Sequence, residues 1–311
     1  MQSLKIPVDK LIDLDFNVVN GNLIPFNNHY LLVGNDSYYR NKTFLHYLDA
    51  DFNLLEKRHY LTRLYQDHRI IFFEGKYHVW CNFFDGESMQ YGILNTSSNS
   101  LEMAKIESEN FIQNEKEKNW SPFLKNGQFH AVYSLFPEFV ILKMTEKGMY
   151  KKIYSEKSVF LKNWVKENVD LHLVKHLGGG TNFIKYKDVF IGTFHVKYND
   201  LKYESYLLIF TTDFLIKNIV QIDYGESLYK GKTLSKLKSE LEHDESTFVV
   251  GEYRKILNYV AFTTGIFFQN DKFYISFGVN DLATKVAVIG KEKLDDFYFL
   301  RSTYRSKLEY R

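Results

Sequence analysis

The chain has 311 residues, of which 45% are hydrophobic and 25% are charged, the proportions of an ordinary soluble globular protein. Its 40 basic and 38 acidic residues leave a net charge of +2, which argues against a nucleic-acid partner held by phosphate contacts. The single cysteine, Cys81, excludes an intrachain disulfide and a cysteine metal cluster.

The N-terminal residues 1–16 include acidic side chains and no apolar core, so they do not resemble a signal peptide. No run of about 18 apolar residues occurs in the chain, and we expect no membrane span. A lone cysteine fits a reducing compartment, so the expected location is cytoplasmic.

Five stretches along the chain share one pattern: an apolar strand, a short turn rich in Asn, Gly, Lys or Asp, and an aromatic strand. In chain order they are NLIPFNNHYLLVGN (22–35), RIIFFEGKYHVWCNF (69–83), SPFLKNGQFHAVYSL (121–135), NFIKYKDVFIGTFHV (182–196) and GIFFQNDKFYISFGV (265–279). Alternating apolar residues around such turns predict β-hairpins.

Further strand-like runs follow the hairpins, at 42–56, 89–104, 139–154, 205–222 and 285–297. Five copies of a three- or four-stranded sheet fit an all-β, five-bladed β-propeller, in which radial repetition protects the sheet edges. A β-sandwich or two unrelated sheets is the alternative. No linker-like tract divides the chain, so we expect residues 1–311 to form a single propeller domain.

Two segments interrupt the repeating pattern. Residues 156–175 are compatible with a short helix or with a loop between blades. Residues 225–245 are polar and dense in charge, which is typical of a solvated surface insertion.

Polar residues recur just before or just after each predicted hairpin. In a propeller these positions crowd around the central channel, so residues far apart in the sequence can converge there. They are Asn35, Asp36, Arg40, Asp67, His68, Arg69, Lys118, Asn119, Lys175, His176, His195, Asn280 and Asp281.

Four stretches of the chain, taken in order, resemble motifs of the glycoside hydrolase family 130 superfamily of β-mannoside phosphorylases and the related glycosyltransferase family 108. The stretch QDHRIIFFEGKYHVWCN (66–82) is similar to the family's Glu-Asp-Pro-Arg, Ile, Gly-Lys turn and Tyr-Tyr. EKNWSPF (117–123) comes next, and LGGGTNFIKYKDVFIGTFH (177–195) is similar to a Gly-rich strand start that ends in Tyr-His. VAFTTGIFFQNDKFYISFGVNDLATKVA (260–287) is similar to Phe-Pro-x-Gly-Ile/Val, a turn and Ser-Tyr-Gly-x-x-Asp. The resemblance implies the same five-bladed propeller.

The resemblance implies that Asp67 is the catalytic general acid. A carboxyl group in an aromatic-walled pocket is desolvated, which favours its protonated form near neutral pH. The alternative is an aspartate that simply pairs with Arg69. Arg69 matches the arginine of the same motif and would either bind phosphate through its planar fork or clamp Asp67.

The other positions divide into two groups by the chemistry of their side chains. His195 matches a family histidine that helps to hold phosphate, and Lys175 or His176 lies near a family lysine with the same task. Asp281 matches an aspartate that hydrogen-bonds the sugar. The candidates for anion binding are Arg69, Lys118, Lys175, His176 and His195, and the candidates for sugar contacts are Asp36, Arg40, Asn119 and Asp281. Trp120, Tyr38 and Phe194 are candidates to stack on the sugar, although most aromatic residues here should be core.

The chain also departs from the family pattern. His68 replaces the family's proline, and the stretches MQYGILNTS and FHAVYSLFP lack the arginines that the phosphorylases carry there. A phosphorylase needs several cations to hold inorganic phosphate, so transfer from a nucleotide sugar or sugar phosphate, or hydrolysis, becomes a competing expectation.

The preferred interpretation is a carbohydrate-active enzyme that transfers a glycosyl unit, expected to be β-mannosyl, to or from phosphate or a sugar acceptor. Its partners would be a sugar or oligosaccharide together with phosphate, a sugar phosphate or a nucleotide sugar, and no cofactor or metal is needed. A hydrolase would need a second carboxylate about 6.5–9.5 Å away for inversion, from Asp36, Glu117 or Asp281. A propeller that binds glycans without turnover is the alternative of a different class.

Overall fold

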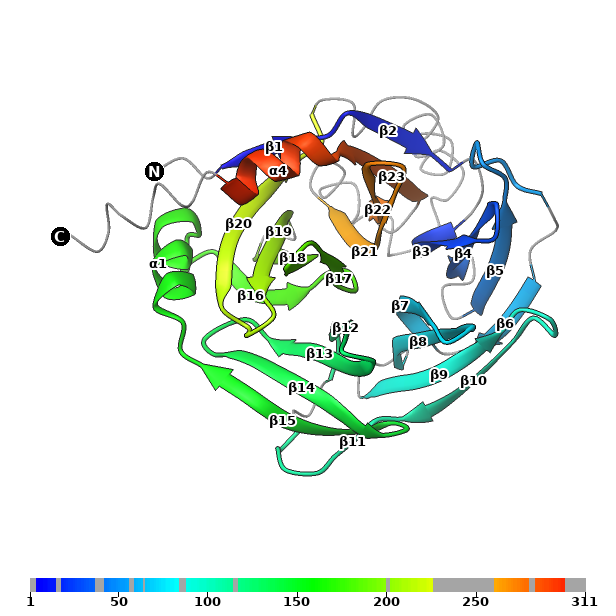
Figure 1. The fold of residues 1–311 in the computed structure, drawn as a ribbon, viewed down its shortest axis with the longest axis horizontal. Coiled ribbons are helices and arrows are strands. Elements are labelled where there is room, and N and C mark those ends of the chain that lie inside the picture. The colour runs from blue at the N-terminus through cyan, green and yellow to red at the C-terminus, as the bar shows by residue number, and fades with distance from the viewer. Residues whose placement is uncertain are drawn as a thin grey trace, which may run out of the picture.

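In the computed structural model, the strands form five small sheets arranged around one axis, a five-bladed β-propeller (Figure 1). This confirms the fold class expected from the hairpin pattern. The structure describes residues 4–14, 18–36, 42–55, 59–63, 65–83, 88–113, 117–199, 202–225, 260–279 and 283–299.

Blades one and two each contain four antiparallel strands, numbered from the axis outward. Blade one consists of β3 (Val18–Phe26), β4 (His29–Asp36), β5 (Lys42–Leu48) and β6 (His59–Arg63). Blade two consists of β7 (Tyr65–Phe73), β8 (Lys76–Phe83), β9 (Met89–Asn95) and β10 (Ser100–Lys105).

Blades three and four are larger. Blade three consists of β12 (Ser121–Lys125), β13 (Gln128–Ser134), β14 (Phe139–Glu146), β15 (Met149–Glu156) and β11 (Glu107–Ser108), the last of which runs parallel to β15 at the outer edge. Blade four has the broken inner strand β16 (Val174–Gly179) and β17 (Ile184–Tyr186), followed by β18 (Val189–Tyr198), β19 (Tyr203–Thr211) and β20 (Ile216–Asp223).

The N-terminal residues complete the last two blades. Blade five consists of β21 (Ala261–Gln269), β22 (Lys272–Val279), β23 (Ala283–Gly290) and, at its outer edge, β2 (Lys10–Asp13). The preceding strand β1 (Lys5–Pro7) adds to β20 in parallel. The first residues therefore close the ring by covering the outer edges of blades four and five (Figure 1).

All five predicted hairpins are present, and their turns explain the turn residues. In the Glu74–Gly75, Asn126–Gly127 and Asn270–Asp271 turns both central residues have positive φ. That is the geometry of a two-residue type I′ turn, whose twist matches that of the flanking strands and which favours Asn, Asp and Gly.

Each interface between neighbouring blades contains its own apolar cluster. Between blades two and three, for example, Trp80 and Trp120 are fully buried with Tyr150. Between blades three and four, Phe123 packs with Phe210 at a ring-centroid distance of 5.6 Å. Successive side chains of a strand point to opposite faces of the sheet, and each face of a blade packs against a neighbouring blade. Both faces therefore need large apolar side chains, which explains the aromatic-rich composition.

Two described helices lie outside the blades. Helix α1 (Val159–Asn168) begins after Ser158, whose hydroxyl accepts a hydrogen bond from the backbone N–H of Leu161 and caps the helix. It confirms the helical alternative for residues 156–175. Helix α4 (Lys291–Phe299) corrects the expectation of a strand-like run over 285–297, since only residues up to Gly290 are strand. The polar segment 225–245 lies almost entirely outside the described residues.

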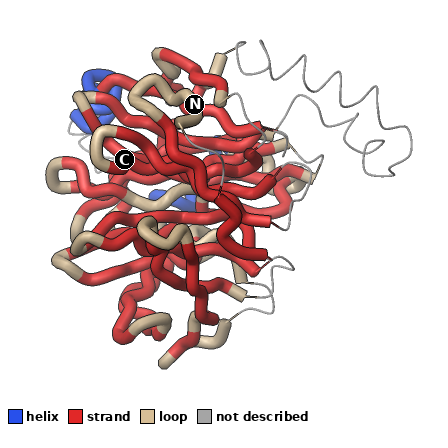
Figure 2. Tube along the Cα trace, turned by 90° about the vertical axis from the view of Figure 1, so that its right-hand side faces the viewer, coloured by secondary structure: helices blue, strands red, loops and turns tan. Residues whose placement is uncertain are grey.

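The strands run from one face of the disc to the other (Figure 2). The inner strands all begin at the same face, and we call the part of that face around the axis the entrance rim. Asp67 near the start of β7, Asn119 just before β12 and His176 in β16 lie at inner-strand starts, and Asn82 lies near the end of β8. In the ranges that the structure describes, no helix is long and apolar enough to cross a membrane.

Candidate functional site

Asp67 lies in a β-bulge at the entrance rim. The pairing of β7 with β8 shifts between Gln66 and Arg69, and Asp67 has a φ of 55°, a left-handed conformation that aspartate tolerates better than most residues. Its carboxylate accepts a hydrogen bond from the Asn82 side-chain amide at 3.0 Å and a longer one from Asn20 at 3.5 Å. The carboxylate is thus held by two neutral amides from blades one and two.

Arg69 lies beside Asp67 but bonds its backbone instead of its carboxylate. Its Nη1 donates to the carbonyl oxygens of Asp67 and His68, at 2.5 and 3.3 Å. The guanidinium lies 5.5 Å from the centroid of the Phe262 ring, which comes from blade five. Arg69 is 1% exposed, and its Nε and Nη2 have no hydrogen-bond partner among the described residues.

Burial lowers the pKa of Arg69 to about 10, an effect that the charge of Asp67 partly offsets. The guanidinium is therefore cationic at neutral pH. A buried cation with two unpartnered nitrogens is costly to keep, which indicates a place where an anionic or strongly polar ligand would supply the missing acceptors.

His195 extends the polar group toward blade four. Its ring packs against those of Phe262 and Tyr203, at centroid distances of 5.1 and 5.2 Å. Its Nε2 lies 3.4 Å from Nε2 of His176, and its buried Nδ1 has no partner among the described residues. Phe262 thus contacts both Arg69 and His195.

Both histidines are neutral over the physiological range. Burial, helped by the electrostatic effects of His176 and Arg69, holds the pKa of His195 well below its usual value. Burial also lowers the pKa of His176 to about 4, with further contributions from Lys197, Lys118 and Lys175. In this state they act as neutral hydrogen-bonding groups next to the Arg69 cation.

The glycine run before β17 lets blade four approach the site closely. A Cβ on Gly178 would lie 2.7 Å from Nε2 of His195, and one on Gly179 would lie 2.1 Å from the carbonyl oxygen of Asn119. A side chain at either position would displace the groups at the entrance rim. The run therefore serves close packing, as expected for a strand that passes near the channel.

Asn119 links the third blade to the same group. Its backbone N–H donates to Oδ1 of Asn82 at 3.2 Å, so that Asn82 bridges Asn119 and Asp67. Asn119 has a φ of 62°, and its buried Oδ1 has no partner among the described residues. Lys118 and Lys175 are exposed, and their positive charges help to lower the pKa of His176.

The structure therefore brings together Asp67, Arg69, Asn119, His176 and His195, with Lys118 and Lys175 at the periphery. Asp36 ends β4 at the entrance rim, but its side chain lies outside what the structure describes. Arg40 and Asp281, and with them Tyr38 and Asn280, also lie outside the described residues.

Several polar and aromatic candidates belong to the core instead. Trp120 and Phe194 are fully buried between blades, so neither can stack on a ligand. His68 is also buried, and burial lowers its pKa to about 3. Glu117, considered as a hydrolytic base, accepts hydrogen bonds from the Trp120 indole and the Tyr133 hydroxyl, both at 2.8 Å, which explains its place in the core.

Four residues near the site were not anticipated from the sequence: Asn20, Asn82, Lys197 and Phe262. Asn20 has a φ of 51° within a bulge of β3, and its Asn-Gly pair was a signal for such a bulge. Asn82 and Phe262 fall inside the quoted motifs, but only the ring of blades shows that they meet Asp67 and Arg69.

No group of three or more His, Cys, Asp or Glu side chains positioned to hold a metal ion occurs among the described residues.

No family model and no curated protein matches the sequence, whereas several solved structures share its fold. The β-1,2-mannobiose phosphorylase from Listeria innocua, in complex with β-1,2-mannobiose, superposes with a TM-score of 0.59 at 12% identity, over 90% of this chain and 91% of that one. A glycosyl hydrolase from Bacteroides ovatus gives 0.57 at 11% identity, over 90% and 86%. The bifunctional GH43-CE protein of Bacteroides eggerthii gives 0.57 at 7% identity, over 93% and 34%. At these identities the likeness shows the fold, a propeller like that of the mannobiose phosphorylase.

Proposed function

We propose that this protein is a carbohydrate-active enzyme that transfers a glycosyl unit, expected to be β-mannosyl, at the entrance rim around Asp67. The observation that carries the proposal is the buried Arg69 cation, whose Nε and Nη2 have no hydrogen-bond partner among the described residues and which lies next to Asp67. A transferase of this kind needs an acid beside the glycosidic oxygen and a cation beside phosphate, and these two side chains offer both.

Asp67 is proposed as the general acid. The hydrogen bonds to its carboxylate come from Asn82 and Asn20, and Arg69 bonds its backbone carbonyl. A carboxyl group that accepts hydrogen bonds from neutral amides can exchange a proton with a substrate hydroxyl, which supports an enzyme over a propeller that only binds glycans.

Arg69, His195 and His176 are proposed to hold the anionic group of a phosphate, a sugar phosphate or a nucleotide sugar. Arg69 would contribute charge and a fork of N–H donors. The neutral histidines would contribute single N–H donors, and Lys118 and Lys175 would attract the anion from the rim. Asn119 is proposed to contact the sugar through its unpartnered Oδ1, and Asp36, Arg40 and Asp281 keep the proposed sugar-binding role that the motifs imply.

Hydrolysis is the second candidate. The glycosyl hydrolase from Bacteroides ovatus shares the fold, and the stretches MQYGILNTS and FHAVYSLFP lack the arginines that mannoside phosphorylases carry there. Since both oxygens of Glu117 are engaged by Trp120 and Tyr133, the second carboxylate would have to come from Asp36 or Asp281.

An activity screen tests the proposal. Mannose 1-phosphate with sugar acceptors, GDP-mannose with sugar acceptors, and β-mannosides with and without phosphate are offered to the wild type and to Asp67→Asn. The matched control is Asp213→Asn, in the exposed turn between β19 and β20. We expect turnover by the wild type and the control, and a loss of about 10²–10⁴-fold in Asp67→Asn.

The dependence on phosphate separates the candidates. Turnover of β-mannosides only with phosphate indicates a phosphorylase, transfer from mannose 1-phosphate or GDP-mannose without phosphate indicates a transferase, and release of free mannose indicates a hydrolase. Equal turnover by Asp67→Asn and the wild type would remove Asp67 from the mechanism, and binding of β-mannosides without any turnover would favour a glycan-binding propeller.

A further inference from the structure

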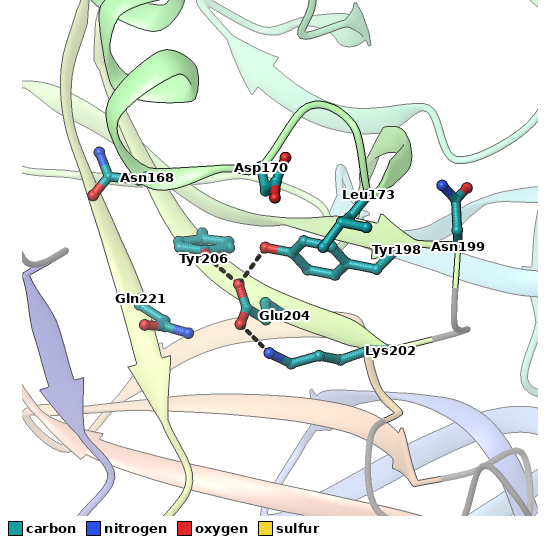
Figure 3. Close-up of a pocket in the computed structure, with 9 residues that line it drawn as sticks. All are labelled: Asn168, Asp170, Leu173, Tyr198, Asn199, Lys202, Glu204, Tyr206 and Gln221. Carbon is teal, nitrogen blue, oxygen red and sulfur yellow. Dashed lines mark hydrogen bonds and ion pairs between the residues drawn. The ribbon is translucent and has the colours of Figure 1, made fainter.

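A cavity of about 500 Å³ lies beside blade four near the end of helix α1 (Figure 3). We call it the rear pocket, and its lining includes Asn168, Leu173, Tyr198, Asn199, Lys202 and Glu204. Its volume falls within the range of about 300–1,000 Å³ typical of sites for small molecules.

The rear pocket and the proposed site lie on opposite faces of one hairpin. Successive side chains of a strand point to opposite faces of the sheet. His195 pairs with Ser205 across the β18–β19 ladder, whereas Val196 pairs with Glu204. His195 therefore faces Phe262 of blade five, whereas Tyr198 and Glu204 lie on the opposite face of the blade, which packs toward blade three. The rear pocket and the proposed site are therefore separate.

Glu204 forms a fixed acceptor in the rear pocket. Its Oε2 accepts hydrogen bonds from the hydroxyls of Tyr198 and Tyr206, at 2.7 and 2.6 Å, and its Oε1 accepts one from Lys202 at 2.7 Å. Burial raises the pKa of Glu204, but the hydrogen bonds from Lys202, Tyr206 and Tyr198 outweigh that effect and lower it. The carboxylate is therefore ionised, and Oε1 can accept a further hydrogen bond from a ligand.

Two carboxamides are fixed on opposite sides of the rear pocket (Figure 3). The amide nitrogen of Asn168 donates to the carbonyl of Trp164 at 2.9 Å, and that of Asn199 donates to the carbonyl of His172 at 3.3 Å. One N–H of each carboxamide is engaged in this way, which fixes the side chain and leaves its Oδ1 as an acceptor. Leu173, which is 55% exposed, adds apolar surface to the same wall.

The charges in the rear pocket select a neutral ligand. An anion would meet the carboxylates of Asp170 and Glu204, and a cation would meet the ammonium group of Lys202. A metal ion would need more acidic or histidine ligands than the described residues bring together. Several oriented acceptors, an ammonium donor and an apolar wall suit a ligand with many hydroxyl groups and a C–H face, which is the chemistry of a sugar.

We propose that the rear pocket is a second sugar-binding site, which holds one or two sugar units of a glycan and takes no part in bond cleavage. It does not depend on the chemistry proposed for Asp67, because it lies on the other face of the hairpin and uses none of the same side chains.

The test is a nuclear magnetic resonance titration of the ¹⁵N-labelled full-length chain with β-1,2-mannobiose and β-1,4-mannobiose, with glycerol as the control polyol. The side-chain amide resonances of Asn168 and Asn199, assigned by their loss in alanine variants, report on the rear pocket. The imidazole resonances of His176 report on the proposed site at the axis. Asn199→Ala and Lys202→Met alter exposed or half-exposed side chains, and Lys151→Met on the outer strand β15 is the matched control.

We expect at least one mannobiose to shift the Asn168 amide saturably, with a dissociation constant of about 1 mM. Asn199→Ala and Lys202→Met should each weaken that binding about tenfold, while Lys151→Met and Asp67→Asn leave it unchanged. Shifts of His176 alone would support the axial site and overturn the rear pocket. The absence of Asn168 shifts with both disaccharides, or equal shifts with glycerol, would also overturn it.

Discussion

Asp67 owes its orientation to a backbone conformation that few residues other than glycine adopt. The bulge that produces a φ of 55° turns the carboxylate toward Asn82 and Asn20, and sites with unusual backbone geometry are frequently functional. The sequence predicted an acid at this strand start because Asp67 lies within one contiguous motif. It did not predict the amides that hold the acid, because they come from different strands and from another blade.

The role of Arg69 can be measured by binding. Arg69→Met removes the buried guanidinium while keeping most of its apolar volume, and we expect mannose 1-phosphate to bind about 10–100-fold more weakly, since hydrogen bonds to charged groups contribute about 1.5–3 kcal/mol. Arg69→Lys should not restore the affinity, because an ammonium group cannot present a planar fork. Calorimetry on both variants, with the exposed Lys185→Met as control, checks this. Unchanged affinity in Arg69→Met would contradict it.

The neutral state of His176 leads to a second prediction at this scale. Burial lowers its pKa to about 4, and a bound anion favours the imidazolium form, so binding should raise that pKa. Sulfate is the suitable probe because it does not titrate between pH 4 and 8. The pKa of His176, followed by its imidazole resonances, should rise by about one unit or more when sulfate saturates the site. Superimposable titrations with and without sulfate would show that no anion binds beside it.

At the level of elements, hairpins were predictable and their surroundings were not. Period-two patterns around type I′ turns are local signals, and all five such stretches form hairpins. Residues 291–297 were expected to continue a strand, yet they form most of helix α4 after Gly290. Trp120 and Phe194 were candidates for stacking on a sugar, and the structure buries both between blades. The sequence could not show this, because burial between blades arises only in the assembled ring.

The close approach of Gly179 in blade four to Asn119 can be tested by substitution. Gly179→Ala would place a methyl group 2.1 Å from the carbonyl oxygen of Asn119, where backbone must shift. We expect a loss of about 1–3 kcal/mol in the free energy of unfolding, together with a loss of turnover larger than the loss of stability explains. Urea unfolding measures the first, and the rate assay measures the second.

The control for this change is Gly75→Asn, at a turn where a Cβ would meet nothing within 4 Å and where asparagine tolerates positive φ. It should leave both stability and turnover nearly unchanged. If Gly179→Ala behaves like Gly75→Asn, blade four does not pack against Asn119 as described.

For the whole molecule, the ring of blades explains why the site residues come together and why the protein should be sensitive to acid. Five apolar interfaces hold the blades, and strands β1 and β2 join the first residues to blades four and five. Residues separated by more than a hundred positions thereby meet around Phe262. No local pattern contains that information, so the membership of the site had to come from the ring itself.

Acid should unfold the protein through its buried histidines. The pKa of His68 is about 3 in the folded state and about 6.5 in the unfolded chain. The unfolded chain therefore takes up a proton as pH falls below 6.5. The stability associated with His68 is present above pH 6.5 and is lost as pH falls toward 3, by up to about 1.4 kcal/mol per pH unit.

The variant His68→Gln isolates this effect. It should flatten the pH dependence of the free energy of unfolding between pH 6.5 and 4.5 by about that slope, while His29→Gln, at an exposed position, should leave the wild-type slope in place. Urea unfolding at several pH values measures both. An identical slope in wild type and His68→Gln would show that the imidazole is not buried in its neutral form.

The most direct test of the site is a crystal structure of the protein grown with mannose 1-phosphate. The account predicts the phosphate group within hydrogen-bond distance of the unpartnered Arg69 nitrogens and beside His195 and His176, with the sugar facing the Asp67 carboxylate. Ligand density elsewhere on the molecule, with the space between Arg69 and His195 closed to it, would contradict the account.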